Sequence, residues 1–252
     1  MKRVLLVVAY DGTRYCGWQV QKNGNTIEAE LNRALSDLFG ETIEVIGASR
    51  TDSGVHALGN VAVFDTETRM PAEKIAYALN GRLPEDIRIQ KSMQVADDFH
   101  PRKCACIKRY EYRILNREFE LPSYRLNSHF YRHPLDVKKM QVACPYFLGE
   151  HDFKSFCSIH TQAETTVRTL YSLEVLKEGD LIRIRISGNG FLYNMVRIIA
   201  GTLIQVGGGI LEPEKVKEVL EACDRQAAGP TAPARGLTLV GMCYPDGPDL
   251  SV

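Results

Sequence analysis

The chain has 252 residues, with 31 basic and 31 acidic side chains, so its formal net charge is zero. A neutral balance gives no sign of a nucleic-acid partner, and any RNA-binding surface must be local. The 44% hydrophobic and 25% charged content is typical of a globular protein with one large domain or two small ones. No apolar run approaches the roughly 20 residues of a membrane-spanning helix.

The cysteine pattern and the N-terminus suggest a cytoplasmic protein. Seven cysteines occur without a Cys-x-x-Cys pair, and the number is odd. Reduced thiols in a cytoplasm explain this best. The apolar run 4–9 follows two basic residues, but it is too short for a signal peptide and has no small-residue cleavage site. It predicts a buried first strand.

The first half of the chain predicts the order β-α-β-β-α-β. A strand over 4–10 ends at the turn Asp11-Gly12. Asn25 and Glu28 have the spacing of a capping box and open a helix that stops at Gly40. Further strands are predicted at 43–48, 60–66 and 87–89, and a second helix from 71 to 80.

The second half predicts a similar order. Strands are expected at about 104–115, 167–177, 181–187 and 237–240. Helices are expected from about 134 to 149, from Asn189-Gly190 to about 206, and from 212 to 223. Two split-βαβ units predict an α+β fold with helices on the sheet faces.

A polar loop, 50–57, separates two of the predicted strands. It holds a cation, a carboxylate, hydroxyls and an imidazole, and such loops on rigid frames often carry function. Asp52 alone would commonly be a surface turn residue. A nucleophilic carboxylate must be desolvated and yet ionised, which a fixed arginine makes possible because it lowers the carboxyl pKa. Arg50 and Arg197 are the two candidates.

Arg197 lies inside an apolar run, where an arginine needs a buried partner or a route to solvent. The alternative is a helix arginine whose charged end reaches solvent.

The stretch 100–113 carries five Lys or Arg residues and two tyrosines. Strand alternation places Tyr110 and Tyr112 on one face and Glu111 and Arg113 on the other. Aromatic and cationic residues together suit base stacking and phosphate binding, although a half-exposed strand with core tyrosines has the same composition. Trp18, the only tryptophan, equally fits a core position or an RNA contact.

Four segments together resemble TruA-type tRNA pseudouridine synthases. They are the loop Arg50–Ala57 with Gly59, the stretch 189–197, the Lys-Arg-Tyr-Glu-Tyr run 108–112 with Asp-Asp-Phe-His at 97–100, and Asp11-Gly12, Tyr15 and Gly17-Trp18-Gln19. Two positions depart from the family pattern: Ser49 replaces a glycine and Asn60 a glutamine.

The resemblance implies a pseudouridine synthase fold with two similar ferredoxin-like subdomains, whose antiparallel or mixed sheets meet at a central cleft. Residues 1–103 would carry the aspartate loop, and 104–252 the tyrosine strand and arginine helix. It implies that Asp52 is the nucleophile and Arg197 its ion-pair partner, that Tyr110 stacks on the target uracil, and that Arg50 contacts RNA and assists base flipping.

The implied reaction converts uridine to pseudouridine at positions 38, 39 and 40 of the tRNA anticodon stem-loop. It is an isomerisation without redox or group donation, so no cofactor is needed, and no cofactor motif or metal-ligand spacing is present in the sequence. The family works as a homodimer, with tRNA lying across both subunits.

Two other classes are compatible with parts of the pattern. One is a non-catalytic RNA-binding protein on the same scaffold, with Asp52 idle. The other is an aspartate-dependent phosphohydrolase, which would need a second nearby carboxylate for a divalent ion, and the chain has none between Glu44 and Asp65 other than Asp52.

Overall fold

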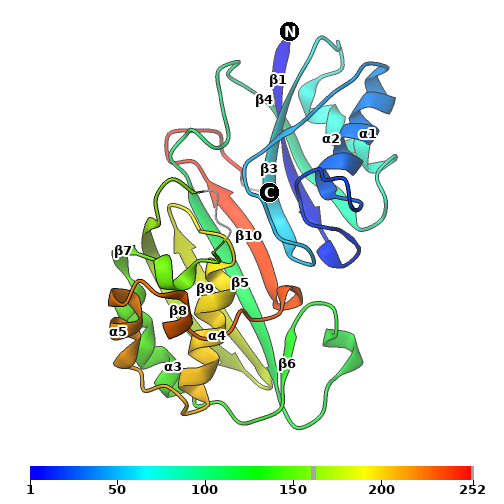
Figure 1. Cartoon of the computed structure of the whole chain (residues 1–252). Coiled ribbons are helices and arrows are strands. Elements are labelled where there is room, and N and C mark those ends of the chain that lie inside the picture. Colours follow the sequence, from blue (N-terminus) through cyan, green and yellow to red (C-terminus); the bar gives the residue numbers. More distant parts are fainter. Residues whose placement is uncertain (160–162, 251–252) are drawn as a thin grey trace. The chain divides into compact units, whose positions relative to one another are not determined.

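A computed structural model describes residues 1–159 and 163–250 of the chain (Figure 1). Two compact units are present: unit 1 comprises Met1–Ile107 and Leu239–Val252, and unit 2 comprises Lys108–Thr238. The predicted subdomains, 1–103 and 104–252, assigned the C-terminal residues differently, because the last strand passes from unit 2 into unit 1. That the chain has two separate subdomains stays a prediction.

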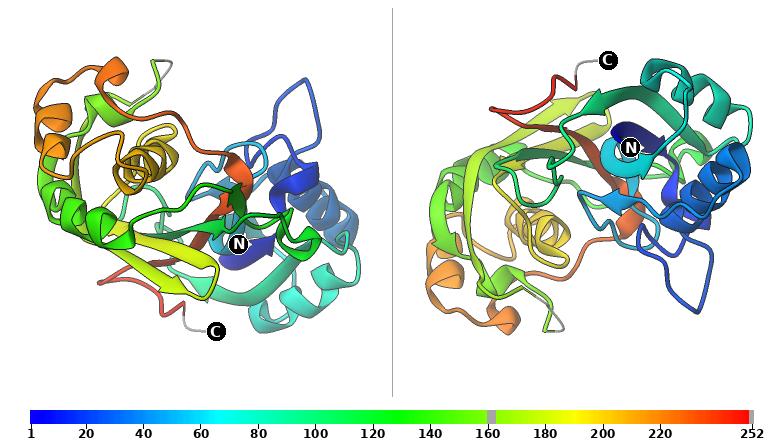
Figure 2. Two further views of the ribbon diagram at one scale, coloured as in Figure 1. Left: turned by 90° about the horizontal axis from the view of Figure 1, so that it is seen from below. Right: turned by 90° about the horizontal axis from the view of Figure 1, so that it is seen from above.

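Unit 1 is a split-βαβ arrangement. Its elements are β1 (Lys2–Tyr10), α1 (Ile27–Phe39), β2 (Ile46–Gly47), β3 (His56–Thr66), α2 (Ala72–Asn80) and β4 (Ile87–Val95), with a 3₁₀ turn at Gly12–Arg14. The strand order is β4-β1-β3, β2 pairs with β3, and these pairings are antiparallel. Helices α1 and α2 lie side by side on one face of the sheet (Figure 2).

The hydrophobic pattern explains this packing. Residues 4–8 of β1 are all buried, as expected for a continuous apolar run in a central strand. On α1, Ile27, Leu31 and Leu35 recur at helical spacing and are fully buried. Gly40 ends the helix in the left-handed conformation, as predicted.

Three predicted boundaries in unit 1 are wrong. Thr26, not Asn25, caps α1, and its hydroxyl accepts the N–H of Ala29. The predicted strand 43–48 is reduced to two residues, because the N–H groups of Ile43 and Val45 bind side chains of α1 instead of a strand. The strand expected at 60–66 begins at His56, so the loop before it is shorter.

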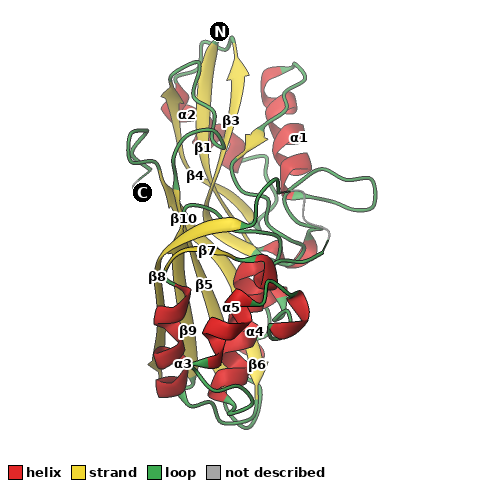
Figure 3. Ribbon diagram, turned by 60° about the vertical axis from the view of Figure 1, so that its left-hand side comes forward, coloured by secondary structure: helices red, strands yellow, loops and turns green. Residues whose placement is uncertain are grey.

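Unit 2 contains β5 (Ile107–Asn116), β6 (His129–Tyr131), α3 (Val137–Ala143), β7 (Gly149–Asp152), β8 (Val167–Glu178), β9 (Leu181–Gly188), α4 (Met195–Gly207), α5 (Lys215–Glu221) and the start of β10 (Leu237–Cys243). The strand order is β5-β9-β8-β7, and β6 pairs in parallel with β5. The helices α3, α4 and α5 lie on one face of these strands (Figure 3). The predicted α+β class is confirmed.

Helix lengths in unit 2 differ from those predicted. Asp136 caps α3 as expected, but the helix ends at Ala143 and becomes a 3₁₀ turn, because Pro145 has no N–H to continue the ladder. Helix α4 begins at Met195, later than expected, after Asn194 in the left-handed conformation. Helix α5 is also shorter than the predicted 212–223. None of the described helices is long and apolar enough to cross a membrane.

In strand β5, Tyr110 and Tyr112 are buried, and so is the residue between them. Glu111, on the other face, is only 5% exposed and meets three arginines. Its carboxylate accepts from Nε of Arg113 at 2.7 Å and from Nε of Arg185 at 3.0 Å, with Arg183 at 3.8 Å. Burial raises the pKa of Glu111, but the hydrogen bonds from Arg113 and Arg185 outweigh burial and lower it overall.

We expect Glu111→Gln to destabilise the protein by about 2 kcal/mol, because it leaves three neighbouring, partly exposed guanidinium groups without the buried carboxylate that is their shared counter-charge. A carboxyl with a lowered pKa stabilises the fold above its unfolded pKa and loses that contribution as the pH falls through its folded pKa. The difference in melting temperature between variant and parent should therefore be largest near neutral pH and shrink in acid.

The control is Glu178→Gln, which removes a 57% exposed carboxylate that lies 3.0 Å from the same Arg183. An exposed pair contributes roughly 0–1 kcal/mol. Equal effects of the two substitutions would contradict a special role for Glu111.

Candidate active site

The loop before β3 carries Asp52 on a tight turn. The N–H of Val55 donates to the carbonyl of Asp52 at 3.1 Å, and Gly54 adopts φ +78°, which favours glycine. Asp52 is half-buried, while Arg50 and Ser53 are exposed. The turn therefore presents one partly desolvated carboxylate between polar, accessible neighbours.

A buried hydrogen-bond network supports this turn from β1 and β3. The hydroxyls of Thr51 and Tyr10 are 2.7 Å apart. The side-chain amide of Asn60, which is fully buried, donates to the Tyr10 hydroxyl at 3.2 Å and to the carbonyl of Ser49 at 3.0 Å. Ser49 and Asn60, the two departures from the family pattern, are thus hydrogen-bonded to each other beneath Asp52.

The segment 15–18 packs directly against the same turn. Trp18 donates its backbone N–H to the carbonyl of Thr51 at 3.0 Å, and the Ser53 hydroxyl donates to the carbonyl of Tyr15 at 3.1 Å. Gly17 has φ +84°, and a Cβ at this position would stand 2.6 Å from the carbonyl oxygen of Thr51. Only glycine permits this close approach without a shift of the backbone.

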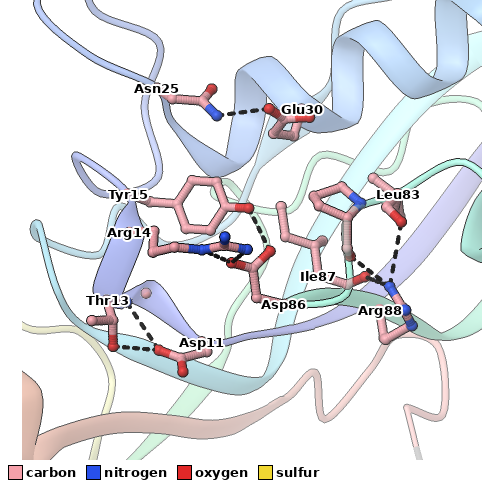
Figure 4. Close-up of polar contacts among 12 residues, drawn as sticks. Asp11, Thr13, Arg14, Tyr15, Asn25, Glu30, Leu83, Asp86, Ile87 and Arg88 are labelled. Atoms are coloured by element: carbon pink, nitrogen blue, oxygen red, sulfur yellow. Dashed lines mark hydrogen bonds and ion pairs between the residues drawn. The ribbon is translucent and has the colours of Figure 1, made fainter. Parts of the chain in front are cut away.

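Asp86 fixes the start of that segment (Figure 4). Its carboxylate accepts from the Tyr15 hydroxyl at 2.6 Å and from Nε of Arg14 at 2.8 Å, and its carbonyl accepts the N–H of Asp11 at 3.0 Å. Burial and the contact with Asp86 raise the pKa of Tyr15 above its usual range. The phenol therefore remains a hydrogen-bond donor at physiological pH.

His56 closes the loop at the start of β3. Its Nδ1 accepts the N–H of Gly12 at 3.1 Å and lies 3.1 Å from a carboxylate oxygen of Asp11. Burial raises the pKa of Asp11, but hydrogen bonds from Thr13 outweigh burial and lower it overall. His56 thus joins the 3₁₀ turn after β1 to the loop that carries Asp52.

In unit 2, Arg197 lies in the first turn of α4 and is fixed by its surroundings. Its Nε donates to the carbonyl of Ala232 and its Nη1 to the side-chain oxygen of Asn194, both at 2.7 Å. The N–H of Ala232 returns a bond to the carbonyl of Arg197 at 3.1 Å. Arg197, which lies inside an apolar run, therefore has hydrogen-bond partners in Asn194 and in the loop that contains Ala232.

Tyr110, also in unit 2, is 7% exposed on β5. Its ring meets that of Phe191 edge-on, with centroids 5.1 Å apart and an interplanar angle of 81°. Phe191 belongs to the same stretch, 189–197, that ends in Arg197. The two segments singled out in the second half of the chain thus share an aromatic contact.

The four predicted site residues divide between the units. Arg50 and Asp52 share the loop of unit 1, and Tyr110 and Arg197 belong to unit 2. The pairing of Asp52 with Arg197 and the stacking role of Tyr110 stay predictions. Within 1–159 and 163–250, no group of three or more His, Cys, Asp or Glu side chains is placed to hold a metal ion.

Sequence reasoning missed the residues that hold the loop in place. Asn60 was noticed only as a departure from a pattern, and Tyr10 only as the end of a strand. A single asparagine at the head of the apolar run 61–64 was a usable signal, because a buried amide needs partners.

We expect Asn60→Ala to lower the catalytic activity of the protein by roughly tenfold and its free energy of unfolding by about 2 kcal/mol. The substitution leaves the Ser49 carbonyl and the Tyr10 hydroxyl without their buried donor. Asn80→Ala is the control, because Asn80 also bridges to backbone atoms, those of Ile89. The melting temperature should fall in both variants, whereas activity should fall only in Asn60→Ala. An equal loss of activity in both variants would refute a specific role of Asn60 in supporting the Asp52 loop.

The described residues define a class of protein: an α+β fold in which a split-βαβ unit carries a half-buried carboxylate on a turn. A family model described as tRNA pseudouridine synthase matches residues 6–102 and 143–245. Three curated relatives are named tRNA pseudouridine synthase A. They come from Thermoanaerobacter sp. (strain X514), 48% identical over 244 residues, Acetivibrio thermocellus, 47% over 244, and Geobacter sp. (strain M21), 43% over 247.

These alignments cover 97–98% of this chain and the whole of each relative. The chain therefore belongs to the tRNA pseudouridine synthase family, and its enzyme class is that of an isomerase.

Proposed function

We propose that this chain converts uridine to pseudouridine in tRNA, at positions 38, 39 and 40 of the anticodon stem-loop. The observation that carries the proposal is the half-buried Asp52 on a turn held by Thr51, Tyr10 and Asn60. Family membership supplies the substrate class, since the relatives are named for tRNA. Covalent catalysis on a nucleotide requires a nucleophile that is fixed in position and partly desolvated.

The proposed reaction needs only side chains of this chain. The bond between N1 of uracil and C1′ of ribose breaks, the base rotates, and a C5–C1′ bond forms while the proton at C5 leaves for solvent and N1 takes up a proton. The bond that the nucleophile forms to the substrate is broken again before the product leaves. Asp52 is the nucleophile at C1′ or C6. Arg197 keeps the carboxylate ionised, and Tyr110 stacks on the base and assists proton removal from C5. Arg50 contacts the RNA backbone and occupies the gap left by the flipped nucleotide.

The proposal includes a homodimer in the cytoplasm, with each tRNA lying across both subunits, as expected from the family. Sedimentation of the full chain at micromolar concentration measures its mass in solution. A monomer as the sole species would exclude this part of the proposal and leave the chemistry untouched.

Tritium release tests the reaction itself. Unmodified tRNA labelled at C5 of uridine should lose tritium to water when the full chain is added, and a transcript without uridine at positions 38–40 should not. The release should continue in EDTA, because no step involves a metal ion. Stable binding of tRNA without release would show a non-catalytic RNA-binding protein instead.

A further inference from the structure

A polar hollow of about 140 Å³ lies in unit 1 beside the Asp52 loop. Its lining includes Trp18 and Gly47, the cationic side chains of Arg50 and Arg102, and the carboxylate of Glu28. The hollow is joined to the loop, because the backbone N–H of Trp18 donates to the carbonyl of Thr51, next to Asp52.

The indole of Trp18 is buried in an unusual way. It is 1% exposed, yet among the described residues its Nε1 has no hydrogen-bond partner. The nitrogen lies directly over Gly47, where a Cβ would stand 2.2 Å from it. Nε1 itself has less than 1 Å² of accessible surface, so Trp18 contributes to the wall of the hollow and not an accessible donor.

The second cation, Arg102, stands on a well-anchored segment. The carbonyl of Phe99 accepts from Nη1 of Arg3 at 3.0 Å, and the carbonyl of Pro101 accepts from the hydroxyl of Tyr244 at 2.9 Å. Arg102 is thus part of a fixed loop, not of strand β5, which begins later, at Ile107. The basic stretch 100–113 of the sequence therefore divides into two parts with different surroundings.

The charges around the hollow favour an anion. Glu28 is the only carboxylate in the lining, and its Oε2 already accepts the backbone N–H of Val20 at 2.8 Å. Burial and the nearby charges of Lys103 and Arg102 lower the pKa of His100, which indicates a positive local potential. Two guanidinium groups form a donor set that matches the oxygens of a phosphate group.

We propose that this hollow binds a backbone phosphate of the tRNA substrate, on a nucleotide adjacent to the one that Asp52 attacks. The inference rests on the proposed function for the identity of the RNA. Arg50 and Arg102 neutralise the phosphate, and Trp18 forms part of the wall against which it lies. The hollow thus fixes the position of the RNA strand at the nucleophile, which base contacts alone would leave free to slide.

Trp18 gives a direct readout, because it is the only tryptophan in the chain. We expect its fluorescence to change when unmodified tRNA transcript is added to the full chain. Arg102→Gln should abolish most of the change and weaken binding roughly tenfold at low salt. The slope of log Kd against log salt should fall by roughly 0.7–0.9, the value for one phosphate contact.

Arg69→Gln is the matched control, since Arg69 is an exposed arginine of unit 1 outside the lining of the hollow. It should leave the fluorescence change and the salt slope at parental values. Gly47→Ala is a second probe, because its Cβ would push Nε1 of Trp18 aside. Equal salt slopes for Arg102→Gln and Arg69→Gln would overturn the proposal, whatever the fate of Gly47→Ala.

A second arm distinguishes the source of the anion. If inorganic phosphate changes the Trp18 fluorescence but tRNA does not, the hollow binds free phosphate and the RNA proposal is wrong. Failure of the subsite is separable from failure of the function. If the parental chain releases tritium but Arg102→Gln behaves like Arg69→Gln, the phosphate subsite is refuted and the proposed reaction is not. If no tritium is released but the two variants still differ in fluorescence change and salt slope, the proposed reaction is refuted and the subsite is not.

Discussion

Asp52→Asn is expected to lower pseudouridine formation by at least about 10,000-fold, the scale of losing a covalent nucleophile. The amide has the size of the carboxylate but no negative charge, so it cannot attack a sugar or pyrimidine carbon. The turn should persist, because its hydrogen bond uses the backbone carbonyl of residue 52, and its support comes from Thr51, Tyr10 and Asn60. Single-turnover tritium release measures the rate.

The affinity of Asp52→Asn for tRNA shows whether the variant has lost only its chemistry or also its structure. Removing a negative charge beside RNA should leave Kd for tRNA equal or tighter, because phosphate repulsion decreases. Asp37→Asn is the control, as it makes the same change at an exposed position of α1 and should keep the parental rate. A rate for Asp52→Asn within tenfold of the parent would exclude Asp52 as the nucleophile.

The sequence predicted best where the physical signal is local. The pattern of 104–115 predicted the strand that became β5, and Gly40 marked the end of α1. Asp136 lies near the start of the helix predicted at 134–149, and its carboxylate accepts the N–H groups two and three residues ahead. Each of these signals acts within a few residues, so no knowledge of the rest of the fold was needed.

The support of the loop could not be predicted, because it depends on contacts far apart in the chain. Asn60 reaches Ser49 and Tyr10 across eleven and fifty residues. The β-branched stretch 43–45 has strand propensity, but α1 offers Ser36 and Asn32 as acceptors for its N–H groups. Tertiary partners therefore overrode local propensity, and only the fold identifies them.

Gly17→Ala is expected to lower activity strongly, although Gly17 is not one of the predicted site residues. The methyl group would stand 2.6 Å from the carbonyl oxygen of Thr51 and adds the strain of an L-residue at φ +84°. The three nearest atoms, from Thr51, Asp52 and Ser53, all belong to the backbone, so the clash is relieved only if the turn moves. A displacement of about 1 Å at the nucleophile can cost about 100-fold in rate, and we expect a loss of that size in tritium release.

Gly40→Ala separates the effect of the clash with Thr51 from the effect of backbone strain at a positive φ. Gly40 has a similar φ, +71°, but a Cβ there would meet nothing within 4 Å. Both variants should therefore lose about 1 kcal/mol of stability from left-handed strain, while only Gly17→Ala should lose activity. If their rates were equal, the close approach of segment 15–18 would not position Asp52. If Gly17→Ala instead kept the parental rate and lost stability alone, the turn would hold its shape without this contact.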